Sequence, residues 1–219
     1  YAVAKPDGIV RKPQNLDFER ASAVGVSAQT ALQALRDQLD VKSGHKVLIT
    51  GASGGVGSFA VQIAKSFGAE VTAVCSTRNV ERVTSLGADH VIDYIAEDFT
   101  QGSERYDRIL DNVGTQPMAD VRRVLTPDGR LLSNGASVGG WFGGLGNVFR
   151  AALISMVNKQ QVRPFVSAYS QADGQVLKAL IEAGEVSPLI DQAFPLEQGA
   201  AAVAHVAAGH AQGKTVITM

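Results

Sequence analysis

The residues of this chain whose types and spacing suit chemistry lie in TGASGGVG, residues 50–57, between the apolar run KVLI and the segment SFAVQIAK. Gly51 would turn the chain tightly after a strand, Gly55 would let a pyrophosphate approach the backbone, and Gly57 would let a helix pack on a sheet. The N–H groups at the N-terminus of that helix, together with the helix dipole, would hold phosphate. A glycine turn that binds no ligand is the alternative, but the order of strand, loop and helix favours dinucleotide binding.

A second motif separates the two classes of dehydrogenase whose loops this stretch resembles. Short-chain enzymes need Tyr-x-x-x-Lys downstream of the loop, where the lysine lowers the pKa of the tyrosine. The chain has this spacing once, in YAVAK from Tyr1 to Lys5, upstream of the loop, and neither Tyr94, Tyr106 nor Tyr169 is followed by lysine at that distance. We therefore interpret YAVAK as a chance match within a strand, and the short-chain interpretation loses its catalytic pair.

The elements that must position the loop alternate along the chain from residue 46 onward. Short apolar runs separated by helical patterns predict an α/β fold, a doubly wound parallel sheet with helices on both faces. Pro164 places the strand that contains it at an edge of the sheet. The expected strands are 46–50, 70–76, 90–94, 106–113, 129–136, 162–169 and 214–219, and the expected helices are 18–39, 55–68, 79–87, 118–125, 147–158, 175–184 and 197–211.

Composition excludes several classes of function. The 219 residues carry a net charge of −1, which gives no basic surface for nucleic acid or an anionic membrane. The single cysteine, Cys75, excludes an internal disulfide and a zinc site made of several cysteines. We expect a small-molecule substrate, no stable membrane insertion, and a cytoplasmic location by default. Location in an organelle is the alternative, because a chain that starts at Tyr1 resembles a part of a longer protein whose targeting segment would precede it.

A longer series of segments carries a family resemblance: AVGVSAQTALQAL, ITGASGGVGSFAVQIAKSFGAEVTAVCS, SLGADHVIDY, ILDNVG and GHAQGKTVI. In order and spacing they resemble the C-terminal two-thirds of a zinc-independent medium-chain dehydrogenase/reductase of the quinone-oxidoreductase-like branch. The resemblance implies a Rossmann dinucleotide-binding domain at 21–185. It also implies remnants of a GroES-like β-barrel catalytic domain at 1–20 and 186–219, with the catalytic residues in the part that is missing.

The same resemblance implies an activity, hydride transfer from NADPH to a quinone or an activated alkene. Two alternatives stay open: an alcohol or aldehyde dehydrogenase of the same superfamily, and a nucleotide-binding or redox-sensing module without turnover. Zinc-dependent members carry a ligand cysteine just before the glycine that opens the linking helix. The matching position here is Val24, ahead of Gly25, and valine cannot ligate zinc. The histidines show no paired ligand spacing, so we expect no metal and assign surface or capping roles to His45, His90, His205 and His210.

The choice between NAD and NADP depends on the residues after the second expected strand. An NAD enzyme places an acid about 20 residues beyond the loop, where it binds the ribose 2′-hydroxyl. Here Ser76, Thr77 and Arg78 stand there, and hydroxyl groups with a guanidinium suit a 2′-phosphate. We therefore expect NADP(H) as the cofactor. The alternative is that Ser76 or Thr77 caps the following helix.

The remaining cofactor contacts are predicted in part from the loop and in part from the resemblance. Tyr94 matches a family tyrosine beside the 2′-phosphate, although it could equally be a core aromatic at the end of a strand. Asp111 is as suited to fixing a turn as to touching a ligand, and Cys75 is expected to be a buried, unactivated thiol. The predicted set is Ser53, Gly54, Gly55, Val56, Ser76, Thr77, Arg78, Tyr94, Asn112 and Val113, with Gly135 and Ala136 beside the nicotinamide and His210 near the adenosine phosphate.

Two further expectations concern surfaces. The resemblance implies a homodimer joined through an edge of the Rossmann sheet, for which VRPFVS, residues 162–167, is the candidate segment. The loop SVGGWFGGLG, with Trp141 and Phe142, is either a lid over a planar substrate or a connector that packs on the next helix. For the helix at 147–158 we prefer packing against the protein over a membrane surface, because its polar face carries few basic residues.

Overall fold

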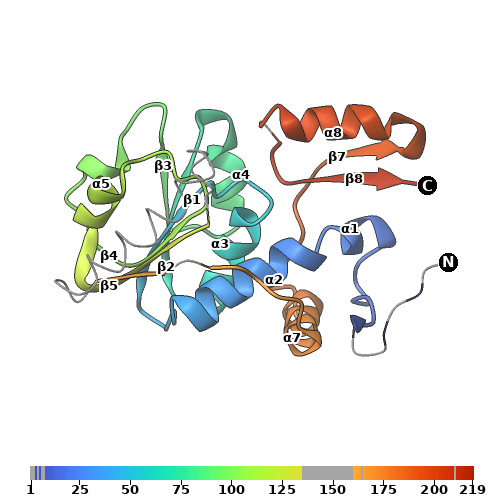
Figure 1. Ribbon diagram of the computed structural model, residues 1–219, viewed down its shortest axis with the longest axis horizontal. Coiled ribbons are helices and arrows are strands. Elements are labelled where there is room, and N and C mark those ends of the chain that lie inside the picture. The colour runs from blue at the N-terminus through green and yellow to red at the C-terminus, as the bar shows by residue number, and fades with distance from the viewer. Residues whose placement is uncertain (1–2, 4, 6–7, 135–159, 164, 210) are drawn as a thin grey trace.

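The computed structural model describes residues 3, 5, 8–134, 160–163, 165–209 and 211–219 (Figure 1). Its strands are β1 (Lys46–Thr50), β2 (Glu70–Cys75), β3 (His90–Asp93), β4 (Tyr106–Asp111), β5 (Leu125–Ser133), β6 (Gln161–Arg163), β7 (Ile190–Pro195) and β8 (Lys214–Thr218). Its helices are α1 (Phe18–Ser22), α2 (Gly25–Gln33), α3 (Gly57–Ser66), α4 (Val80–Ser85), α5 (Met118–Arg123), α7 (Gln171–Glu182) and α8 (Gly199–Ala207). Shorter turns are the π-helical η2 (Ala34–Gln38) and the 3₁₀ segments η3 (Thr77–Asn79), η4 (Phe99–Gln101) and η5 (Leu196–Gln198).

Six strands form one sheet in the order β3-β2-β1-β4-β5-β6, and every neighbouring pair is parallel. The chain runs outward from β1 through β2 to β3, then crosses back so that β4 lies on the other side of β1. This order is that of the Rossmann fold, and it leaves a crevice at the carboxyl ends of β1 and β4 where the winding reverses. The predicted fold class is confirmed, and so is the edge position of β6.

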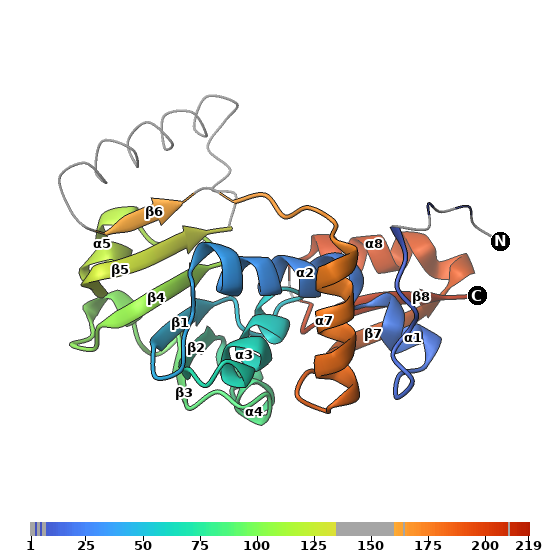
Figure 2. The same ribbon diagram turned by 90° about the horizontal axis from the view of Figure 1, so that it is seen from below.

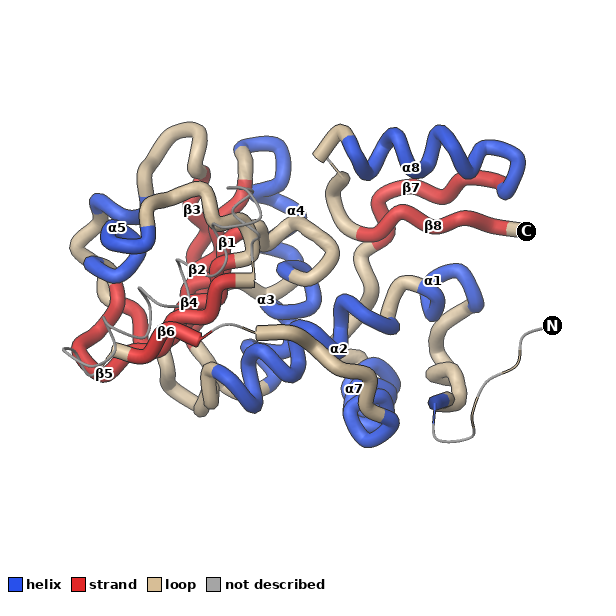
Figure 3. Tube along the Cα trace, viewed as in Figure 1, coloured by secondary structure: helices blue, strands red, loops and turns tan. Residues whose placement is uncertain are grey.

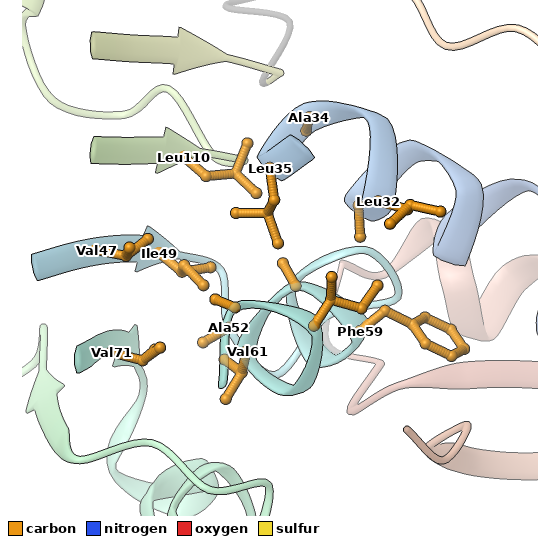
Figure 4. Packing of buried hydrophobic residues seen from close by; sticks show 14 of the residues in the cluster. Leu32, Ala34, Leu35, Val47, Ile49, Ala52, Phe59, Val61, Val71 and Leu110 are labelled. Atoms are coloured by element: carbon orange, nitrogen blue, oxygen red, sulfur yellow. The ribbon is translucent and has the colours of Figure 1, made fainter. Parts of the chain in front are cut away.

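Alternating side chains bury both faces of the sheet. Val47 and Ile49 pack into one apolar cluster with the side chains of α2, η2 and α3 (Figure 4). Leu48, between them in β1, packs instead into a second cluster with Val121 and Val124 around α5. Full burial of one such side chain contributes about 1.5–3 kcal/mol. Helices therefore cover both faces, as continuous apolar strands require.

Two glycines fix the join between β1 and α3. Gly51 has a φ of 60°, which places it in the left-handed region, and a Cβ at Gly57 would lie 2.1 Å from the carbonyl oxygen of Gly51. No side chain fits at that second position, because the obstacle is backbone. The turn at Gly51 and the close packing at Gly57 are both confirmed.

The C-terminal residues build a separate layer. β7 and β8 form a two-stranded parallel sheet, and α8 connects them and packs on them (Figures 1 and 2). This unit lies beside α1, at the end of the molecule opposite α5 and β5 (Figure 3). Whether residues 1–20 and 186–219 belong to a barrel domain stays a prediction.

The structure corrects several predicted elements. The single helix expected at 18–39 is divided into α1, α2 and η2. The break falls at Ala23 and Val24, whose amides donate to carbonyls three residues back instead of four. β7 was not predicted, because its sequence IDQAFP mixes polar residues with a proline. The strand expected at 162–169 is regular only over 161–163, and no described residue of 1–13 is in a strand. The loop with Trp141 and Phe142 and the helix at 147–158 lie outside the described residues.

Candidate functional site

A cleft of about 440 Å³ opens at the carboxyl ends of β1, β2 and β4. This is the edge of a doubly wound sheet at which ligands bind, beside the point where the strand order reverses. Of the predicted cofactor residues, it is lined by Ser53, Gly54, Ser76, Arg78, Tyr94 and Val113. It is also lined by residues that were not predicted, among them Asn79, Glu97, Asp98, Thr115 and Gln116.

The glycine loop presents a helix N-terminus without a side-chain cap. Val56 occupies the N-cap position of α3, and its apolar side chain makes no hydrogen bond to the helix. The loop itself is closed by a hydrogen bond in which the amide of Gly54 donates to the carbonyl of Gly51 at 3.0 Å. The N-terminus of this ten-residue helix, which has no side-chain cap, carries partial positive charge because backbone N–H groups of its first turn lack helical partners. Such an end suits an anion such as a pyrophosphate.

A lysine from the distant C-terminal sheet lies beside this loop. A Cβ built on Gly55 would be 3.0 Å from Cδ and 3.4 Å from Nζ of Lys214, and Nζ donates to the hydroxyl of Ser27 at 3.0 Å. Gly213, with a φ of 132°, holds the start of β8, since a Cβ there would meet the carbonyl oxygen of Leu189 at 2.5 Å. Sequence reasoning missed Lys214, although it lies in the resembling segment GHAQGKTVI.

A buried asparagine joins the loop to the end of β2. The Nδ2 of Asn79 donates to the hydroxyl of Ser53 and to that of Ser76, each at 3.0 Å. Asn79 is only 4% exposed. Ser76 stands at the N-cap of η3 but its hydroxyl makes no capping hydrogen bond. Capping therefore does not explain Ser76, and the residue that does engage it, Asn79, gave no signal in the sequence beyond being polar.

The side chain of Thr77 is bound by Asp93, an acidic residue that the sequence analysis did not consider. Its hydroxyl donates to Asp93 at 2.5 Å, and Asp93 comes from the end of β3 rather than β2. Thr77 is not among the residues that line the cleft, and Glu97 and Asp98 add carboxylates to the cleft wall on the same side. That Thr77 binds the cofactor stays a prediction.

The turn after β4 uses Asp111 and Asn112 for its own geometry. Asp111 is buried, and its Oδ1 accepts from the hydroxyl of Thr50 at 2.6 Å and from the amides of Val113 and Gly114 at 3.2 and 3.0 Å. Asn112 donates through Nδ2 to the carbonyl of Thr50 at 2.9 Å. Of the alternatives for Asp111, the structure favours fixing the turn. Val113 is 45% exposed and presents an apolar side chain to the cleft.

The thiol of Cys75 lines the cleft as a neutral group. The residue is 2% exposed, and burial raises the pKa of the thiol to about 11, with the charge of Asp93 acting in the same direction. Since a nucleophilic cysteine needs the thiolate, Cys75 is not activated at neutral pH. The prediction of a buried, unactivated thiol is confirmed.

The histidines of the described part of the chain make separate local contacts. His45 accepts from the amide of Lys42, His90 lies 3.3 Å from Glu70, and Nε2 of His205 lies 2.6 Å from Asp191. Among the described residues no group of three or more His, Cys, Asp or Glu side chains could hold a metal ion. None of the described helices is long and apolar enough to cross a membrane. Gly135, Ala136 and His210 lie outside the described residues, so their predicted cofactor contacts stay predictions.

The family whose model matches residues 86–217 is described as zinc-binding dehydrogenase. That range includes β3, β4, β5 and the C-terminal sheet, and covers more than half of the chain. This chain belongs to the zinc-binding dehydrogenase family. The resemblance to the quinone-oxidoreductase-like branch of the medium-chain enzymes is confirmed by its relatives.

Two curated relatives and two solved structures illustrate the match. The chain is 32% identical to the chloroplast envelope quinone oxidoreductase homolog of Arabidopsis thaliana, covering 99% of this chain and 67% of the relative. It is 34% identical to a mitochondrial NAD(P)H oxidoreductase of Bos taurus, covering 100% of this chain and 60% of the relative. The quinone oxidoreductase structure from Coxiella burnetii superposes with a TM-score of 0.86 at 29% identity, over 99% of this chain and 65% of that one. An NAD-dependent alcohol dehydrogenase gives 0.81 at 29% identity, over 96% and 61%.

The chain thus spans 60% to 67% of the length of these two curated relatives. The part that it matches includes the whole six-stranded sheet and the glycine loop.

Proposed function

We propose that this chain is the cofactor-binding part of an NADP(H)-dependent oxidoreductase that passes a hydride from NADPH to a quinone or an activated alkene. The observation that carries the proposal is the cleft at the switch point of the sheet. It is lined by Ser53 and Gly54 of the loop that leads into the uncapped helix α3, and by Ser76 and Arg78, which follow β2. Support for the substrate class comes from the names of relatives, which include an NADPH-dependent alkenal/one oxidoreductase of Arabidopsis thaliana, 31% identical over 99% of this chain and 51% of the relative.

The residues present fit a nicotinamide dinucleotide phosphate. The free amides at the start of α3 and the ammonium of Lys214 would hold the pyrophosphate. Ser76 and Arg78 would hold the 2′-phosphate, and Val113 would form an apolar wall where the cofactor crosses the sheet. The cofactor, when bound, supplies the hydride, while the protein supplies position and electrostatics.

We further propose that this member of the family works without zinc. Val24 occupies the N-cap position of α2, where zinc-dependent relatives would carry a cysteine ligand, and it has no atom that binds zinc. An alcohol dehydrogenase that uses zinc would need ligands from elsewhere. Metal analysis of the purified protein tests this proposal, because one equivalent of tightly held zinc would contradict it.

A homodimer joined through the sheet edge is also proposed. β6 is the last strand of the six-stranded sheet, and a strand at an edge can pair with a second copy. Sedimentation of the purified protein should give twice the mass of one chain.

The cofactor assignment is tested by the substitution Ser76→Asp. A carboxylate there would repel a 2′-phosphate and offer an acceptor to a 2′-hydroxyl, so preference should move from NADPH towards NADH. The loss of one hydrogen bond to a charged group corresponds to about 1.5–3 kcal/mol of binding free energy. Calorimetric titration of both cofactors into both proteins measures the change. If the unsubstituted chain binds NADH as tightly as NADPH, the NADP assignment is wrong.

A further inference from the structure

Asn79 lies where the 3₁₀ segment η3 passes directly into α4, and its side chain does not cap the helix. It is the N-cap residue of α4, yet its side chain makes no hydrogen bond to the helix backbone. An N-cap asparagine normally accepts from the backbone amides of the first turn through its side-chain oxygen. Here that oxygen, Oδ1, is buried and has no partner among the described residues. Local helix stability therefore does not account for the orientation of this side chain.

The amide nitrogen is instead used to bridge two elements that converge on the cleft. Nδ2 donates to Ser53, from the loop after β1, and to Ser76, from the end of β2, at 3.0 Å each. Asn79, Ser53 and Ser76 all line the cleft. The bridge fixes the distance between the loop and the end of β2, which is the span between the predicted pyrophosphate and 2′-phosphate sites.

The direction of these bonds decides what the two serines can do. A hydroxyl group has one proton to donate and two acceptor positions. Because Asn79 donates to both oxygens, each serine keeps its own proton, and neither hydroxyl has another partner among the described residues. Both serines are therefore left as donors, the form that an anion requires.

We propose that Asn79 is a positioning residue that sets Ser53 and Ser76 as hydrogen-bond donors and so gives the cleft its preference for a 2′-phosphorylated adenosine. The inference rests on the proposed function, because it assumes that this cleft binds the adenosine end of a nicotinamide cofactor. Asn79 acts on the phosphate through the two serines.

The test uses 2′,5′-ADP and 5′-AMP, which differ by the 2′-phosphate alone, titrated by calorimetry into the chain and its variants. Asn79→Ala removes the amide, and Asn79→Asp replaces a donor by an acceptor that would take the serine protons. Both should lower the affinity for 2′,5′-ADP by roughly tenfold or more, and the affinity for 5′-AMP by less than about threefold. Gln33→Ala is the matched control, since it deletes a buried amide between α2 and α7 far from the cleft. It should lower the melting temperature and leave the ratio of affinities unchanged.

A double-mutant cycle separates positioning from direct contact. In a Ser53→Ala/Ser76→Ala background, Asn79→Ala should change the affinity for 2′,5′-ADP by less than about threefold, because the groups through which it acts are gone. An undiminished loss in that background, or an equal loss for the two ligands, would overturn the inference. The Ser53→Ala/Ser76→Ala variant alone must also lose the preference for 2′,5′-ADP. This measurement tests the inference even if the Asn79 variants do not fold. If the unsubstituted chain binds neither ligand, the proposed function falls and the inference with it; binding without these effects overturns the inference alone.

Discussion

Gly55 and Gly57 are two residues apart but would meet different surroundings if each gained a side chain. At Gly55 the nearest atoms belong to the flexible end of Lys214, whereas at Gly57 the obstacle is the backbone of Gly51 at 2.1 Å. We predict that Gly55→Val abolishes NADPH binding and leaves the melting temperature nearly unchanged. Gly57→Ala should instead destabilise the fold by about 1–3 kcal/mol or more, because backbone must shift. Calorimetry and thermal unfolding of both variants measure this, and unchanged NADPH affinity in Gly55→Val would contradict the cofactor site.

Single residues differ in how far the sequence reveals their roles. The glycines were predictable because strand, loop and helix are consecutive, so the requirement for a small residue is local. Lys214 and Asn79 were not. Lys214 reaches the loop from β8, more than 150 residues later, and Asn79 departs from the capping role that its local sequence indicates. Contacts of this kind depend on how segments far apart in the sequence come together in the fold, which a local sequence pattern does not reveal.

α7 is fastened to α2 and η2 through one buried carboxylate. Asp173 accepts from Nε2 of Gln33 at 2.7 Å and pairs with Arg36 at 2.8 Å. Burial alone would raise the pKa of Asp173, but the bonds from Arg36 and Gln33 outweigh it and hold the pKa below its ordinary value. A carboxyl whose pKa is lowered on folding contributes stability above its unfolded pKa of about 3.9, and loses it as the pH falls through the folded value.

We therefore predict that Asp173→Asn lowers the free energy of unfolding at pH 7 by about 1–3 kcal/mol, because a charge-assisted hydrogen bond is lost. The difference from the unsubstituted chain should shrink as the pH falls below about 4, because Asp173 of the unfolded chain is protonated first and the native carboxyl only at lower pH. Urea unfolding followed by circular dichroism between pH 3 and pH 7 measures both. Lys178→Met is a suitable control, because it removes a partly exposed helix pair with Glu182 and should cost less than about 1 kcal/mol. A constant difference across this pH range would contradict the role of the ionised carboxyl.

The strands that helices cover on both faces of the sheet were predicted from the sequence, and the strand that is largely exposed was not. β1 and β2 are largely apolar because helices cover both faces, and β4 adds the buried pair Ile109 and Leu110, so the existence and order of these strands could be predicted. Phe194 is the one buried residue of β7, whose neighbouring Gln192 and Ala193 are both exposed, and its partner β8 lies beyond α8. The break between α1 and α2 falls at Ala23 and Val24 and leaves the helical periodicity of residues 18–39 uninterrupted, so the sequence pattern does not reveal it.

The molecule joins the six-stranded Rossmann sheet to a small two-stranded sheet. Lys214 is the link with a functional consequence, because it starts β8 in the small sheet and lies against the glycine loop of the large one. The candidate phosphate site therefore depends on the C-terminal unit as well as on the loop. The proposed phosphate site consists of the loop, the start of α3 and this lysine, all of which lie within the described residues.

Hydride transfer needs more than phosphate binding, since a substrate must be held against the nicotinamide. The relatives are longer than this chain, and the resemblance places a catalytic domain in the additional length. Positioning of two reactants can lower a barrier by roughly 7–11 kcal/mol, so a chain without that wall should transfer hydride very slowly. We predict that these 219 residues bind NADPH but reduce quinones or enones negligibly, whereas a full-length relative that contains the additional length turns over. Steady-state NADPH consumption with a panel of quinones, measured on both chains, decides the question. Comparable rates would mean that the catalytic groups lie within these residues, and the cleft at the ends of β1, β2 and β4 would then have to contain them.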